Sequence, residues 1–151
     1  MAPVVVVEDD PHRVDVASLM ERHVVFAQEV TPAGHVHALG PESLVTPEVT
    51  VFGARRDGVL LGVGALREFE PGHGEIMSMH TLEDVRGQGV GRAIVEAVLG
   101  AAHERGYERV SLETGTSSAR PVVARRSCVA SRPWSWEWWA SDEWVATWFV
   151  G

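Results

Sequence analysis

The residues that most clearly suggest chemistry are the glycines and arginines of segment 86–92, Arg-Gly-Gln-Gly-Val-Gly-Arg. Gly87, Gly89 and Gly91 occupy alternate positions directly before an apolar segment with helical spacing. Glycine lets a ligand approach the backbone closely, and the first N–H groups of a helix have no partner inside the helix. Such a helix start binds anions, above all phosphate. The segment therefore predicts a phosphate-binding loop.

Two familiar phosphate-binding loops do not match this spacing. A dinucleotide-binding loop needs a third glycine three residues after its second, but Arg92 occupies that position after Gly89, and Ile94 occupies it after Gly91. The loop of the nucleotide hydrolases needs a lysine after its last glycine, and the chain contains no lysine. The pattern that remains is Arg-x-x-Gly-x-Gly, from Arg86 to Gly91.

The elements that must position this loop form an α/β pattern. β-Branched and apolar segments predict five strands, the first of them buried, at 4–7, 49–55, 59–66, 74–82 and 108–113. Helical spacing and end signals predict helices at 11–28, near 41–44 and at 90–105. Because one strand precedes the loop helix and another follows it, these two strands are expected to pair in parallel. The predicted fold is a mixed sheet with helices on both faces.

Local signals refine this pattern. Asp10 and Pro11 predict a helix cap followed by the first helical residue. Asp57-Gly58 predicts a hairpin between the second and third strands. Gly62 and Gly64 in the third strand predict a bulge or the close approach of a neighbouring element.

Composition limits the classes of partner. The 151 residues are predicted to form one domain, 1–151, and the net charge of −8 argues against a nucleic-acid partner. No segment approaches the roughly 18 apolar residues of a membrane span, so no membrane partner is expected. The single cysteine, Cys128, fits a cytoplasmic location. His35 and His37 alternate without a third ligand in view, so no metal site is predicted.

Three segments together resemble the GNAT superfamily of acyl-CoA-dependent N-acetyltransferases, whose pyrophosphate-binding signature is Arg/Gln-x-x-Gly-x-Gly/Ala. They are Glu75-Ile-Met-Ser-Met-His-Thr81, the loop 86–92, and Arg105-Gly-Tyr-Glu-Arg-Val-Ser-Leu-Glu-Thr-Gly115. The resemblance is to a bacterial subgroup of small enzymes and covers about residues 4–118. Met77 stands where that subgroup more often has a lysine, so no role is transferred to it.

The resemblance implies acetyl-CoA as co-substrate, and a primary amine of a small molecule or peptide as the acceptor that attacks directly. The pantetheine arm would follow the backbone of residues 79–81, and the pyrophosphate would lie on the amides of residues 88–92. The expected cofactor-binding residues are Met79, His80, Thr81, Arg86, Gly87, Gln88, Gly89, Val90, Gly91 and Arg92. An N–H near Met79 would stabilise the developing oxyanion.

The resemblance also implies a base, because an amine attacks only when it is neutral. Carboxylates on this strand have that role in many relatives, which makes Glu75 the first candidate. His80 is the second candidate and Glu113 a further one, although His80 lies inside the predicted strand, where it could simply pack.

After residue 118 the sequence departs from the family pattern. All six tryptophans lie between Trp134 and Trp148, and no tyrosine follows Tyr107 to serve as the general acid. One hypothesis is a reading-frame change near residue 119. The other is a native tail, with a short helix at 123–130 and strands within 134–150 that bury their rings in the sheet or at a homodimer contact. A non-catalytic acyl-CoA-binding protein is therefore the alternative function.

Overall fold

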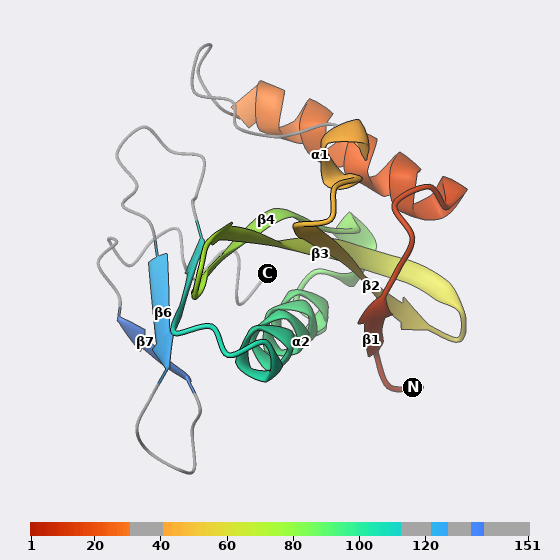
Figure 1. Cartoon of the computed structure of the whole chain (residues 1–151). Coiled ribbons are helices and arrows are strands. Elements are labelled where there is room, and N and C mark those ends of the chain that lie inside the picture. The colour runs from red at the N-terminus through yellow and green to blue at the C-terminus, as the bar shows by residue number, and fades with distance from the viewer. Residues whose placement is uncertain (31–40, 113–121, 127–133, 138–151) are drawn as a thin grey trace.

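The computed structural model describes residues 1–30, 41–112, 122–126 and 134–137. Within them, seven strands form one sheet in the order β1-β2-β3-β4-β5-β6-β7. Helix α1 covers one face of the sheet and helix α2 the other (Figure 1). The elements are β1 (Val5–Glu8), α1 (Val14–Val30), the 3-10 helix η1 (Pro41–Leu44), β2 (Val49–Arg56), β3 (Val59–Glu70), β4 (His73–Thr81), the 3-10 helix η2 (Glu83–Val85), α2 (Val90–Glu104), β5 (Arg109–Leu112), β6 (Val122–Arg126) and β7 (Trp134–Glu137).

The strand pairing confirms the predicted mixed sheet. Strands β4 and β5 are parallel and α2 connects them, whereas the other neighbouring strands pair antiparallel. Asp57 and Gly58 both have positive φ, at 51° and 82°, which is the backbone of a tight two-residue hairpin turn. Helix α2 ends before Gly106, whose φ of 75° lets the chain turn into β5. None of the described helices is long and apolar enough to span a membrane.

Three local predictions were wrong. Strand β1 is an exposed edge strand, because it pairs only with β2 among the described strands and leaves Val5 and Val7 about half exposed. Helix α1 begins at Val14 rather than at Pro11, because Asp10 caps a turn instead, its carboxylate accepting from the His12 N–H at 2.8 Å. Residues 122–126 form strand β6 against β5, which excludes a helix there; 127–130 lie outside the described residues.

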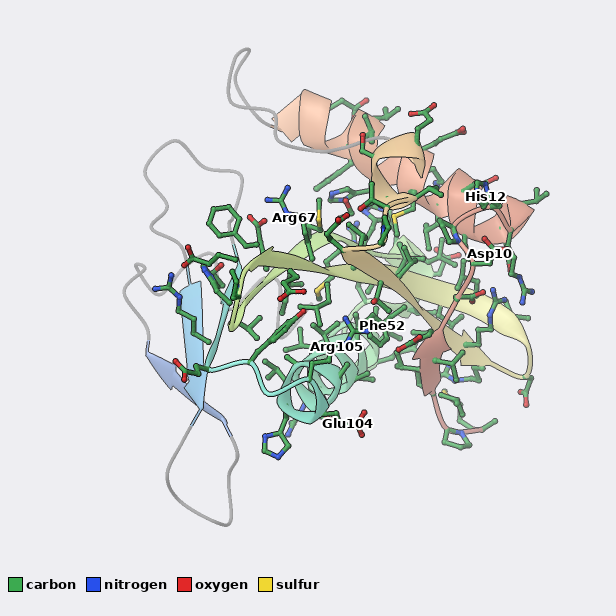
Figure 2. All side chains as sticks on the ribbon, viewed as in Figure 1. Asp10, His12, Phe52, Arg67, Glu104 and Arg105 are labelled. Carbon is green, nitrogen blue, oxygen red and sulfur yellow. The ribbon has the colours of Figure 1, made fainter. Side chains whose placement is uncertain are left out.

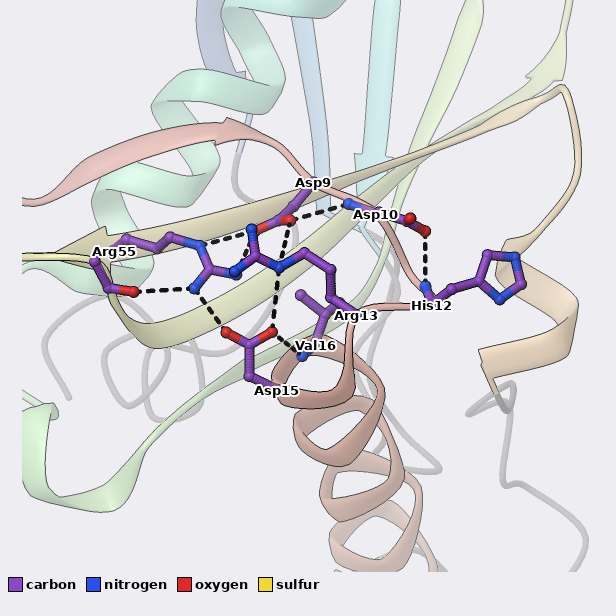
Figure 3. A network of polar contacts seen from close by, with 8 residues as sticks. Asp9, Asp10, His12, Arg13, Asp15, Val16 and Arg55 are labelled. Carbon is purple, nitrogen blue, oxygen red and sulfur yellow. Dashed lines mark hydrogen bonds and ion pairs between the residues drawn. The ribbon is translucent and has the colours of Figure 1, made fainter.

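An ion-pair network attaches the start of α1 to the sheet (Figure 3). The Arg55 guanidinium at the end of β2 donates to Asp9 and to Asp15, with Nη distances of 2.7 Å to both carboxylates. The hydrogen bond from Arg55 lowers the pKa of Asp15, although Asp15 is largely exposed. Gly53 makes the network possible, because a Cβ at that position would collide with the Asp9 carboxylate.

Helix α2 packs closely on β3, as the strand glycines predicted. A Cβ added to Gly64 would lie 2.7 Å from Ile94 Cγ2, and one added to Gly62 would lie 3.0 Å from Ile94 Cδ1. Ile94 is fully buried in the cluster between α2 and the sheet. The lack of side chains at Gly62 and Gly64 therefore determines how closely the first turns of α2 pack against the sheet.

Gly64→Ala tests this packing. The added methyl group requires Ile94 or the helix to move, so the free energy of unfolding is expected to fall by about 1–3 kcal/mol. Urea unfolding followed by circular dichroism measures the change. Gly100→Ala is the matched control, because Gly100 lies exposed on α2 with nothing within 4 Å of its added Cβ. That control should gain about 0.5–1 kcal/mol; an equal gain in Gly64→Ala would contradict the close packing.

Candidate active site

The loop between β4 and α2 has the backbone that anion binding requires. Gly87 and Gly89 have φ values of 77° and 81°, in the left-handed region that other residues avoid. Gly89 is the residue before α2, and its carbonyl accepts the helix's first hydrogen bond, from the Ala93 N–H at 3.0 Å. The N–H groups that precede Ala93 in α2 therefore have no partner within the helix. They point out of the positive end of the helix dipole.

The side chain of Gln88 holds the loop in place. Its Oε1 accepts from Arg56 Nη1 at 3.0 Å, and its Nε2 donates to the Asp84 carbonyl at 3.2 Å. Its own N–H already donates to the Val85 carbonyl at 3.2 Å. The Gln88 N–H, one of the amides expected to bind a ligand, therefore already has a backbone acceptor. The N–H groups of residues 89–92 are the better candidates for ligand binding.

The two loop arginines are solvent-exposed. Arg92 Nε contacts Glu96 Oε1 at 2.9 Å, one helical turn further on, and its side chain is 75% exposed. Arg86 is exposed and contributes positive charge near His80. These arginines can add charge at the loop, but the backbone of residues 87–91 forms its shape.

Strand β4 contains a bulge beside this loop. Ala65 pairs with Met77 and Val63 with His80, so two residues, Ser78 and Met79, oppose the single residue Gly64. Ser78 has a φ of 51°, which is uncommon for a residue with a side chain. Within the described residues, β4 and β5 pair as far as Ile76, opposite Leu112. Beyond that point β4 continues to Thr81, past the last described residue of β5.

The bulge changes which residues share a face of β4. Met79 packs in the cluster under α2, whereas Met77 packs against the cluster under α1. His80 also faces α1, where its ring meets those of His23 and Phe26 at centroid distances of 5.6 and 5.7 Å. In a regular strand, Met77 and His80 would point to opposite faces. The bulge therefore brings the side chain of His80 to the α1 face.

Glu75 lies on that same α1 face and is paired. It stands directly opposite Arg67 of β3, and its Oε2 accepts from the Arg67 guanidinium. Figure 2 shows Arg67 on the α1 side of the sheet. Arg67 also lies over the ring of Phe69, 5.6 Å from its centroid. The side chain of Glu75 is only 19% exposed, so one carboxylate oxygen is engaged in a partly buried ion pair.

His80 is neutral at physiological pH. Burial is the largest cause that lowers its pKa, to about 4, and the nearby charges of His23, Arg86 and Arg22 act in the same direction. Burial also lowers the pKa of His23. A neutral imidazole can accept a proton, but one with so low a pKa holds it weakly near neutral pH.

Two open clefts lie outside the loop. One, of about 600 Å³, borders the segment 8–12 and the start of β2. The other, of about 360 Å³, lies between η1 and the end of β3, and Arg67 and Phe69 line it. No group of three or more His, Cys, Asp or Glu side chains in the described ranges could hold a metal ion.

The predicted residues thus divide between two places on β4 and its loop. Met79, Thr81 and the loop 86–92 lie along the β4 bulge and the start of α2, while Glu75 and His80 face α1. The candidate Glu113 lies outside the described residues. Sequence reasoning missed Arg67 as the partner of Glu75. A signal was available, because their opposite charges stand at equal sequence distances on either side of the Pro71 turn.

The low pKa of His80 predicts acid sensitivity of the fold. The unfolded state binds a proton near pH 6.5, whereas folded His80 does so only near pH 4, so stability is full above pH 6.5 and decreases as pH falls toward 4. The loss from this group is of the order of 2–3 kcal/mol. In urea unfolding from pH 7 to 4, His80→Gln should show a smaller loss than the unmodified chain.

His12→Gln is the control for this measurement, because His12 is exposed and belongs to a turn. It should keep the acid sensitivity of the unmodified chain. Equal slopes for His80→Gln and His12→Gln would show that His80 is not the buried neutral group.

Comparison with known proteins identifies the family. The sequence model described as "Acetyltransferase (GNAT) family" matches residues 16–124. The uncharacterized N-acetyltransferase YsnE of Bacillus subtilis (strain 168) is 39% identical over 111 residues, which cover 74% of each chain. The crystal structure of a putative acyl-CoA N-acyltransferase from Klebsiella pneumoniae superposes with a TM-score of 0.60 at 22% identity, covering 76% of this chain and 74% of that one.

A structure determined with acetyl-CoA bound shares the same fold. This GNAT family acetyltransferase from Elizabethkingia anophelis has a TM-score of 0.58 and 17% identity, with 76% of this chain and 67% of that chain covered. The family match covers most of helix α1, strand β4, the loop 86–92 and helix α2. The chain therefore belongs to the GNAT family of acyl-CoA-dependent N-acetyltransferases.

Proposed function

We propose that this protein transfers the acetyl group of acetyl-CoA to a primary amine of a small molecule or a peptide, by direct attack of the amine. The observation that carries the proposal is the loop 86–92, whose left-handed glycines open α2 beside the bulged end of β4. Family membership and the acetyl-CoA bound in the Elizabethkingia relative support the choice of co-substrate.

The loop fits a pyrophosphate group for three physical reasons. The space at the missing Cβ of Gly89 is open, with nothing within 4 Å. The first amides of α2 need acceptors, and the helix dipole favours a negative charge there. Arg86 and Arg92 are exposed and can add charge without having to break a buried contact. In this proposal, the backbone of residues 79–81 holds the pantetheine arm.

The β4 bulge is the proposed site of the acyl group. In this proposal, a backbone N–H near Met79, where the bulge interrupts the regular ladder, donates to the thioester carbonyl. That donor would stabilise the oxyanion as the amine attacks. Acetyl-CoA supplies an activated acyl group when bound, so the mechanism needs no nucleophile from the protein.

The proposed proton acceptor is Glu75, with His80 as a second, neutral group on the same face. Arg67 occupies one oxygen of Glu75, which keeps the carboxylate oriented and leaves its second oxygen for the amine or a water molecule. His80 lies further along β4 and can accept a hydrogen bond from the acceptor. We propose Glu75 rather than His80 as the main base because protonation of His80 requires acid pH.

Gly89→Val tests the binding loop. The side chain would fill the open space at the loop, so saturating acetyl-CoA should no longer raise the melting temperature. In the unmodified chain, a concentration 100 times the Kd stabilises by about 2.7 kcal/mol, a shift of several degrees. Gly72→Val is a closely matched control, because Gly72 has nearly the same φ of 80° and equally open surroundings, but lies in the turn before β4, at the opposite end of that strand from the loop. It should lose stability but keep the acetyl-CoA shift.

A shift that persists in Gly89→Val would place the ligand elsewhere. Release of the coenzyme A thiol with a panel of amines then separates catalysis from binding alone. A chain that shows the acetyl-CoA shift but releases no thiol with any amine would be the non-catalytic binding protein.

Glu75→Gln tests the base. The substitution keeps size and polarity but removes the proton acceptor, so kcat is expected to fall about 10²- to 10⁴-fold while KM for acetyl-CoA changes little. Glu68→Gln on the adjacent strand is the control, because Glu68 is exposed and lies one residue from Arg67. Equal rates for the two variants would exclude Glu75 as the base.

A further inference from the structure

A chain of polar side chains leads from Ser111 of β5, the residue next to Glu75, to the protein surface. Ser111 stands opposite Glu75 in the parallel register of β4 and β5, so the two share the α1 face. Ser111 Oγ lies 2.8 Å from Nε2 of His73. The other ring nitrogen of His73, Nδ1, lies 3.4 Å from Glu70 Oε1. Glu70 in turn accepts from Arg109 Nη2 at 2.6 Å.

The chemistry of these groups gives the chain a direction. A carboxylate can only accept, so the proton of the neutral imidazole belongs on Nδ1, facing Glu70. Nε2 is then the acceptor, and the Ser111 hydroxyl donates to it. Among the described residues, this leaves the lone pairs of Ser111 Oγ available to a donor on the α1 face, beside Glu75. The arrangement is that of a hydroxyl, an imidazole and a carboxylate connected in series.

Burial decreases along the chain toward its outer end. The side chain of His73 is only 12% exposed, whereas that of Glu70 is 51% exposed. The ring of Phe69 packs on His73 at a centroid distance of 5.2 Å. The hydrogen bonds from Arg109 and then His73 lower the pKa of Glu70. Glu70 therefore stays ionised and stabilises a positive charge on the imidazole.

The proposed reaction removes two protons from the nitrogen of the acceptor. An alkyl amine arrives as an ammonium ion at neutral pH and becomes an amide, so its nitrogen loses two protons. One must leave before attack, to expose the lone pair, and one leaves after the C–N bond forms. The coenzyme A thiolate takes up one proton as the C–S bond breaks, and the other goes to solvent. Glu75, paired with Arg67, is one acceptor on the α1 face, and the chain that begins at Ser111 offers a second route for the proton that goes to solvent.

We propose that Ser111, His73 and Glu70 form a proton-transfer chain that neutralises the ammonium of the acceptor before it attacks. This inference rests on the proposed function. The ammonium gives its proton to Ser111 Oγ as the Ser111 proton passes to His73 Nε2. The imidazolium is held by Glu70 and releases its Nδ1 proton at the exposed end of the chain. Ser111 would contact the substrate, and His73 and Glu70 act through it as positioning residues.

The charged groups around the chain are consistent with this direction. Glu70 of β3 faces the outer ring nitrogen of His73 and itself accepts from Arg109 of β5, while Ser111 of β5 faces the inner ring nitrogen. The ion pair of Arg67 and Glu75 follows on the same face. A carboxylate paired with an arginine therefore lies at each end of the chain.

The pH dependence of His73→Gln separates proton transfer from a structural role. At pH 7 the variant should lose about 10- to 100-fold in kcat with an alkyl amine. Near pH 10, where much of the free amine is already neutral, its rate should approach that of the unmodified enzyme. Added imidazole should restore part of the loss at pH 7. His12→Gln, a change at an exposed histidine, should match the unmodified enzyme throughout.

Ser111 provides the second variant. Ser111→Ala should resemble His73→Gln, the double variant should be no slower than either, and Ser111→Thr should keep most of the rate because it retains the hydroxyl. Losses that are equal at pH 7 and pH 10 and insensitive to imidazole would overturn the chain. So would acetyl-Ser111 detected by mass spectrometry, because Ser111 would then be a nucleophile.

A nuclear magnetic resonance measurement tests the chain without activity. Two-bond ¹H–¹⁵N spectra, assigned with His73→Gln, should show His73 protonated at Nδ1. The opposite tautomer would overturn the proposal even if the enzyme is active. If no amine is acetylated, the proposed function fails while this tautomer still decides whether the hydrogen-bond chain exists.

Discussion

The close contact between α2 and the glycines of β3 is the constraint on which the site depends. Ile94 fills the space that side chains at positions 62 and 64 would occupy. Ile94 lies in the first turns of α2, so its depth fixes where the start of that helix, Gly89 and Val90, meets the end of β4. A larger residue on β3 would lift the helix start from the strand. The backbone proposed to bind phosphate would then no longer be aligned with the bulge.

The same glycine strand accommodates the irregularity in β4. Gly64 is the residue that faces both Ser78 and Met79, and a side chain there would already collide with Ile94. One extra residue in β4 then sends Met79 toward α2 and His80 toward α1. Strain at a non-glycine residue with positive φ persists only where the surroundings hold it. Here, pairing with β3 on either side of the bulge holds Ser78.

Sequence reasoning recovered what depends on local rules and missed what depends on register. The loop, its helix and the hairpin at Asp57-Gly58 follow from glycine conformations and apolar spacing, which neighbouring residues determine. The close approach at Gly62 and Gly64 was predicted for the same reason. The bulge at Ser78 was not located, because Glu75-Ile-Met-Ser-Met-His reads as a regular strand and a one-residue shift changes no composition.

Two further misses have tertiary causes. The run Val4 to Val7 resembles a buried strand, yet β1 pairs only with β2 among the described strands. The side chains of Val5 and Val7 on one of its faces are exposed. The contact of Ser111 with His73 joins residues 38 positions apart through a parallel pairing, whose register no local pattern encodes. The short helix expected at 123–130 failed for a related reason, since residues 122–126 complete the sheet beside β5.

The sheet separates two electrostatic tasks that would interfere if they shared a face. On the α2 side, uncharged backbone amides and the helix dipole can bind an anion. Anion binding there does not require a cluster of buried cations, although the net charge of the chain is −8. On the α1 side, carboxylates and imidazoles with their paired arginines offer places for protons. Strand β4 contributes to both faces, because successive side chains along a strand point to opposite faces of the sheet. Its bulged backbone lies between the two faces. In the proposed mechanism, the carboxylate base therefore lies close to a polyanionic co-substrate without facing its phosphates, and this holds only as long as the register between β3 and β4 is kept.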